Sequence, residues 1–151
     1  MARAPTGSLS DMTDRNPLLQ LGSLQSRLPE LIAKKGAPPW SEAVVLTDDI
    51  QAFVICHSPG QPNDTHYHHH DEWWVVLQGE IDWSIEGQTA PIHARAGDFV
   101  FGPKHLWHHL EPVGTAPSIR VAINARGEFH RYDRPRLQAP VMGSGLTLRQ
   151  M

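Results

Sequence analysis

A dense cluster of histidines and carboxylates lies between residues 60 and 79, in the segment GQPNDTHYHHHDEWWVVLQG. His66, His68, His70 and Glu72 all occupy even positions there. Successive side chains of a β-strand point to opposite faces, so an extended chain would aim most of these groups to one side. Neutral imidazole nitrogen and carboxylate oxygen are ligands of divalent Fe, Mn, Ni, Co and Zn. The cluster therefore predicts a metal site, and its mid-chain position disfavours an expression tag.

Length and composition favour one globular domain. The chain has 151 residues, of which 40% are hydrophobic and 19% charged, which is typical of a folded protein with a core. The net charge is −3 and no basic stripe is present, so we expect no nucleic-acid partner. The apolar runs are too short to cross a bilayer, so we expect no membrane partner.

The chain contains a single cysteine, Cys56, so no intrachain disulfide can form. It lies in the apolar run FVIC, which favours a packed small hydrophobe over a reactive thiol. The first residues, MARAPTGSLSDMTDRN, lack the apolar core of a signal peptide. Together these features predict a cytoplasmic protein.

The chain divides into three segments by composition. Residues 1–16 are small and polar, which predicts a loose N-terminus. We expect one domain over residues 17–126, entered through a short helix that begins near Pro29 and ends before Gly36. Residues 127–151 have no clear period, which predicts a C-terminal tail that lies over the domain or is partly disordered.

Seven short apolar segments follow the predicted helix and are separated by turn residues, which predicts an all-β sandwich or barrel. The segment EWWVVLQ is apolar on both faces, so a second sheet, the helix or a partner subunit must cover the face that does not line the interior. A homodimer is therefore expected. The segments are AVVLT, IQAFVICHS, EWWVVLQ, EIDWSIE, APIHARA, DFVFG and SIRVAINA.

The spacing of the histidine cluster resembles the first motif of the cupin superfamily. Gly60, His66, His68, Glu72 and Gly79 fit G-x5-H-x-H-x3-E-x6-G without a gap. The segment DEWWVVLQGEIDWSIEG also looks like the stretch in 3-hydroxyanthranilate 3,4-dioxygenases, which are iron cupins that open an aromatic ring with O2.

A second segment resembles the other cupin motif, G-x5-P-x-G-x2-H-x3-N. Gly97, Pro103 and His108 occupy matching positions, whereas His105 stands where the motif has glycine and Pro112 where it has asparagine. We consider His105 as a donor to a ligand, a substrate-contacting base or a surface group.

The resemblance implies a double-stranded β-helix, the cupin or jelly-roll barrel, with a core over residues 43–124. By position it implies His66, His68, Glu72 and His108 as ligands of one metal ion, with Fe(II) first and Zn, Mn, Ni or Co as alternatives. Some cupin dioxygenases use two histidines and one carboxylate, which leaves the role of His68 open.

The resemblance also bears on the substrate. The ring-opening dioxygenases hold the substrate carboxylate with arginines near the ligands, but Pro62 and Pro112 occupy the corresponding positions here. The nearest arginines are Arg95 and Arg120, and Arg120 lies in a strand-like run that could face inward. His105 and Arg120 are therefore our candidate catalytic residues.

These expectations combine into one functional prediction and two rivals. The prediction is a non-haem oxygenase that uses O2 on a small aromatic or enolisable substrate. The first rival is a Zn, Mn or Ni lyase, isomerase or hydrolase that uses the metal as a Lewis acid. The second is a cupin that binds a small molecule without converting it.

Overall fold

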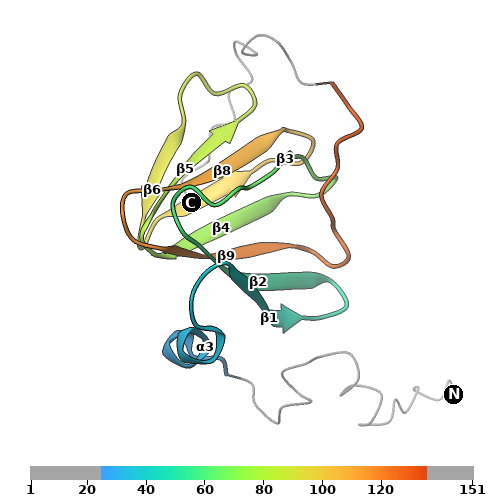
Figure 1. Ribbon diagram of the computed structural model, residues 1–151. Coiled ribbons are helices and arrows are strands. Elements are labelled where there is room, and N and C mark those ends of the chain that lie inside the picture. Colours follow the sequence, from blue (N-terminus) through green and yellow to red (C-terminus); the bar gives the residue numbers. More distant parts are fainter. Residues whose placement is uncertain (1–24, 136–151) are drawn as a thin grey trace, which may run out of the picture.

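Two antiparallel β-sheets face one another in the computed structural model, which describes residues 25–135 (Figure 1). The predicted loose N-terminus and most of the predicted tail lie outside these residues. One sheet has the order β1-β2-β9-β4-β7, with bounds Trp40–Leu46, Ile50–His57, Ser118–Ala125, Glu72–Gln78 and Phe99–Gly102. The other has the order β3-β8-β5-β6, with bounds Thr65–His66, His108–Val113, Glu80–Ile85 and Ile92–Arg95. The all-β double-stranded β-helix is thus confirmed.

The core lies between the sheets and follows from strict alternation along the strands. In β5, Ile81, Trp83 and Ile85 are buried, whereas Glu80 and Ser84 are exposed. Each apolar side chain on the inner face is removed from water on folding. Full burial of one such side chain contributes about 1.5–3 kcal/mol to the stability of the fold. The main cluster draws on both sheets and includes Trp74, Val76, Ile81, Trp83, Val100 and Leu110.

The predicted helix forms as α3, Leu28–Lys35. Pro29 lies in the first turn, where its missing N–H has no intrahelical partner to lose. Gly36 adopts φ 74° just past the last turn, and its N–H donates to the carbonyl of Ile32 at 2.9 Å. No helix within residues 25–135 is both long and apolar enough to cross a membrane.

Helix α3 covers part of the outer face of the five-stranded sheet, as Figure 1 shows. Leu28 and Leu31 pack there against a cluster of Val54, Cys56 and Ile119. Cys56 is buried, and burial raises the pKa of its thiol. This placement agrees with the predicted packing role.

The outer face of β4 and β7 lies beyond the part of the sheet that α3 contacts. Trp73 is 41% exposed and Phe99 72% exposed. The same sheet therefore has a covered apolar half and an open apolar half among the described residues.

The sequence patterns did not identify two of the strands, β3 and β8. β3 has only two residues, and β8 reads HHLEPV, with few apolar side chains. They pair with each other, Thr65 with His109 and His66 with His108. This pairing joins the two cupin-like motifs.

The chain after β9 returns across the end of β3. Tyr67 and Arg131 form an isolated antiparallel bridge, with N···O distances of 3.2 and 3.0 Å. Residues 128–134 therefore lie over the domain.

Candidate metal centre

Four side chains from two segments of the sequence meet at one end of the inner cavity. They are His66 on β3, His68 in the loop that follows, Glu72 at the start of β4 and His108 at the start of β8. Their ligand atoms all lie within 4.8 Å of one another, and all four residues are buried. The structure thus brings together the four predicted ligands from both sheets.

The distances between the donor atoms fit a shared divalent ion. Nε2 of His66 lies 3.0 Å from Nε2 of His108, and Nε2 of His68 lies 2.9 Å from Oε2 of Glu72. Two ligand atoms at right angles around an ion are about 3 Å apart when each bond is about 2.1 Å. Nε2 of His68 makes no hydrogen bond of regular geometry among the described residues.

Contacts on the other ring nitrogens orient the imidazoles. Nδ1 of His68 donates to the carbonyl of Phe129 at 3.0 Å, and Nδ1 of His66 lies 3.2 Å from Oδ1 of Asp64. A proton on Nδ1 leaves the Nε2 lone pair free for a metal, which is how metal-binding histidines are commonly held.

The charge states suit metal binding. Burial raises the pKa of Glu72, but the neighbouring rings of His108 and His68 lower it by more, so that the net pKa is about 2. Burial lowers the pKa of His66 to about 3, with His108 and His130 acting in the same direction. Glu72 is therefore a carboxylate and His66 a neutral imidazole at neutral pH, which are the forms that bind metals.

A second layer of side chains surrounds the cluster. The His130 ring stacks on His66 with centroids 3.5 Å apart, and its Nδ1 donates to Oδ2 of Asp64 at 2.7 Å. Tyr132 also donates to this carboxylate. Nδ2 of Asn124 donates to Oε1 of Glu72 at 3.3 Å.

Our sequence reasoning missed these supporting residues. The even position of Asp64, just before His66 and His68, was an available signal. His130 had none, because it reaches the centre only through the fold of residues 128–134.

A cavity of about 350 Å³ opens beside the cluster. His66 and Glu72 reach it from one side, and Arg120 lines it from β9. Trp74, which shares the parity of Glu72, also lines it. Its other apolar walls come from Pro39, Trp40, Ile55, Leu110 and Ala122.

The structure brings one of the two candidate catalytic residues to this cavity and leaves the other outside it. Arg120 is 5% exposed and lines the cavity. His105 is exposed, has φ 68° and does not line the cavity. Its ring lies 5.4 Å from that of His69, between centroids.

The two remaining histidines of the first motif are also at the surface. His69 and His70 are exposed, and Nδ1 of His70 lies 2.5 Å from Oε2 of Glu128. His70 thus contacts the segment that follows β9, and neither histidine joins the cluster.

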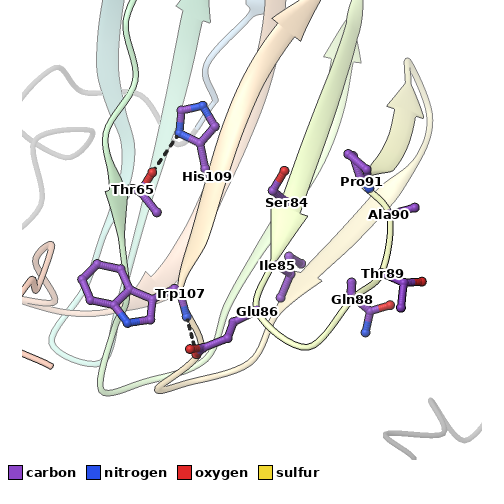
Figure 2. A pocket seen from close by; sticks show the side chains of 10 residues that line it. All are labelled: Thr65, Ser84, Ile85, Glu86, Gln88, Thr89, Ala90, Pro91, Trp107 and His109. Carbon is purple, nitrogen blue, oxygen red and sulfur yellow. Dashed lines mark hydrogen bonds between the residues drawn. The ribbon is translucent and has the colours of Figure 1, made fainter. Parts of the chain in front are cut away.

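A second hollow, of about 470 Å³, lies on the outer side of the four-stranded sheet (Figure 2). It is larger than the inner cavity, but none of the four clustered residues lines it. In Figure 2, His109 and Thr65 lie close together beside this hollow, with 3.3 Å between Nδ1 and Oγ1. The chemistry therefore favours the smaller, inner cavity.

Comparisons with known proteins agree with this architecture. The sequence pattern of the cupin domain matches residues 53–124. No curated protein matches the chain.

Three solved structures illustrate the similarity of fold. An RmlC-like cupin with a double-stranded β-helix fold from Methanocaldococcus jannaschii has a TM-score of 0.55 at 19% identity, covering 61% of this chain and 84% of that one. A cupin-2 domain protein from Shewanella frigidimarina has a TM-score of 0.58 at 15% identity, covering 68% and 96%. KdgF from Halomonas sp. has a TM-score of 0.51 at 23% identity, covering 62% and 81%.

The matched residues include all four candidate metal ligands and every strand that carries them. The domain match and the shared barrel therefore lead to one conclusion: residues 53–124 form a cupin domain.

Proposed function

We propose that this protein is a mononuclear metal-dependent enzyme, specifically a non-haem iron oxygenase that acts on a small aromatic or enolisable substrate. The observation that carries the proposal is a buried set of three imidazoles and one carboxylate that adjoins a cavity with both apolar and polar walls. Bound Fe(II) would supply open coordination positions for substrate and O2. Zn, Mn, Ni and Co are alternative occupants, since the same donors serve them.

Different residues of the chain would bind the metal ion and orient its ligands. His66, His68, Glu72 and His108 would hold the ion. Asp64 and the Phe129 carbonyl would keep ring protons on Nδ1 and so keep Nε2 available.

The apolar walls of the cavity would exclude water and favour a weakly polar substrate. Arg120 would contact the substrate, because it is the buried cation of the cavity. Our earlier candidate His105 has no comparable support, since it lies outside the cavity lining.

We further propose a homodimer in the cytoplasm. The open apolar half of the outer sheet face, which includes Trp73, Leu77 and Phe99, supports a self-association surface. Size-exclusion chromatography with light scattering would test it, and a monomer at micromolar concentration would refute it.

The central experiment combines metal analysis with O2 consumption. Protein made without a metal-capturing tag is analysed for bound elements, loaded anaerobically with Fe(II), and then mixed with catechols, hydroxyanthranilates and β-diketones under air. We expect near-stoichiometric iron and substrate-dependent O2 uptake.

Other outcomes would change the assignment. Stoichiometric Zn, Mn or Ni, with turnover under anaerobic conditions, would favour the Lewis-acid lyase, isomerase or hydrolase. Tight binding of a small molecule without conversion would favour a binding protein. No metal under any loading would refute the proposed centre.

A further inference from the structure

Arg120 lies on the inner face of β9, where a cation needs a partner. It pairs across the sheet with Ile55 on one side and Val76 on the other, and it is 5% exposed. Its Nε has no hydrogen-bond partner among the described residues. The ion pairs found between residues 25 and 135 do not include it.

A buried guanidinium without a carboxylate is costly, because desolvation of an ion is offset only by a paired charge and full hydrogen bonding. Burial lowers the pKa of Arg120 to about 10, with Glu72 acting in the opposite direction. The group therefore stays charged at neutral pH.

Glu72 is the carboxylate whose charge raises the pKa of Arg120, but its oxygens already have partners. Oε2 lies 2.9 Å from His68 and 3.5 Å from His108, and Oε1 accepts from Asn124. The cation thus lacks a carboxylate partner of its own.

The contact between Arg120 and His57 leaves donors in excess. NH1 of Arg120 lies 3.3 Å from Nδ1 of His57, and Nδ2 of Asn63 lies 3.4 Å from the same nitrogen. Burial and the charge of Arg120 lower the pKa of His57, so its ring is neutral and Nδ1 has a single lone pair to offer. Two donors share that one acceptor, and Nε of Arg120 has no partner among the described residues.

Arg120 and its neighbours border the same cavity as the candidate metal ligands. Arg120, His57 and Asn63 line it together with His66 and Glu72. Its volume of about 350 Å³ is near the lower limit for small-molecule sites, which suits one ring or a short chain. Trp74, Ile55, Leu110 and Ala122 supply apolar contacts for the body of such a molecule.

We propose that Arg120 and Asn63, on the Nδ1 side of His57, bind the carboxylate of a small substrate whose other end lies at the metal centre. The substrate class is therefore a compact carboxylic acid with a ring or short apolar body. The inference rests on the proposed function for the role of the metal, but the anion subsite depends on residues that are not metal ligands.

The test uses metal-loaded, full-length protein and three probes that differ at one position. Catechol carries a pair of hydroxyls suited to the metal, 3,4-dihydroxybenzoate adds a carboxylate, and 3,4-dihydroxybenzamide replaces that carboxylate with a neutral group of similar shape. Anaerobic calorimetric titration gives each affinity without turnover. We expect the acid to bind about 10- to 100-fold more tightly than the amide, as for a charge-assisted hydrogen-bonded pair.

The Arg120→Gln variant should lose this preference and keep its metal stoichiometry and its catechol affinity. Arg95→Gln is the matched control, because Arg95 is exposed on β6 and should keep the full preference. Arg120→Lys retains the positive charge but lacks the planar guanidinium, so this variant should keep only part of the preference for the acid over the amide.

The outcomes separate this inference from the proposed function. Equal affinity of the wild-type protein for the acid and the amide would overturn the carboxylate subsite, even if Arg120→Gln failed to fold. Retention of the preference in folded Arg120→Gln would do the same. Failure of the protein to bind any metal would instead refute the proposed function. If metal-free protein still prefers the acid over the amide, and Arg120→Gln abolishes that preference, the carboxylate subsite would stand even though the metal centre does not.

Discussion

His108 and His109 are neighbours on β8 with opposite environments. His108 is 1% exposed and points into the barrel, where its Nε2 lies 3.0 Å from Nε2 of His66. His109 is half-buried on the outer face, where Nδ1 lies 3.2 Å from the carbonyl of Asp64 and 3.3 Å from the hydroxyl of Thr65. Figure 2 shows His109 beside the outer hollow.

The difference between the two faces lies in whether the ring nitrogens have protein partners. On the outer face, a carbonyl and a hydroxyl lie within hydrogen-bonding distance of Nδ1 of His109. On the inner face, imidazole nitrogens and a carboxylate approach one another with no hydrogen bond for Nε2 of His68. Lone pairs that converge in a buried space mark a metal site. Neither the number of histidines nor the size of a hollow does so.

The largest expected effect comes from removing the inner histidine. His108→Ala should lower metal affinity by more than about 100-fold, because a direct ligand contributes more than the 10–100-fold typical of outer contacts. Turnover should be lost with the metal. Elemental analysis and O2 uptake measure both.

His109→Ala is the control for His108→Ala, since it removes the same group from the opposite face. It should retain metal and activity. Circular dichroism should show a folded barrel for both variants. Full activity in His108→Ala would contradict the assignment of the centre.

The next pair of residues on β8, Leu110 and Glu111, also differs between the inner and outer faces, and here the difference should affect stability. Leu110 is buried in the main core, whereas Glu111 is exposed. Leu110→Ala should lower the free energy of unfolding by about 2–5 kcal/mol, from lost burial and a residual cavity. Glu111→Ala should change it by less than about 0.5 kcal/mol. Equal effects in urea titrations of metal-free protein would show that the strand does not alternate as described.

The sequence was informative where short-range periodicity decides the outcome. The even positions of His66, His68 and Glu72 placed them on one side of an extended chain, and the structure gathers them. The predicted helix near Pro29 formed because its end signals, Lys34, Lys35 and Gly36, are local. The cupin motifs supplied His108, which the strand pattern alone had not placed.

The sequence was less informative where contacts depend on distant segments. β8 was not recognised as a strand because two of its three inward positions are His108 and Pro112. His130 reaches Asp64 across 66 residues, and no period predicts such a contact. His105 is close to His108 in sequence, but a turn at φ 68° leaves it exposed.

The smallest effect should come from the contact behind His66. Asp64→Asn removes the charge that favours a proton on Nδ1 of His66, while an amide oxygen can still accept from His130. Loss of such a contact commonly lowers metal affinity by about 10- to 100-fold. Competition with a chelator at pH 7 measures the affinity.

Thr65→Val is the matched control for Asp64→Asn, because Thr65 is the next residue and lies on the outer face with His109. It should leave metal affinity within about 2-fold, since removing a half-exposed hydroxyl changes little at a distance. A similar loss in both variants would mean that the whole β3 edge, rather than the Asp64 carboxylate, sets the position of His66. A loss in Asp64→Asn alone would place the effect on the inner face, where the unsatisfied lone pairs converge.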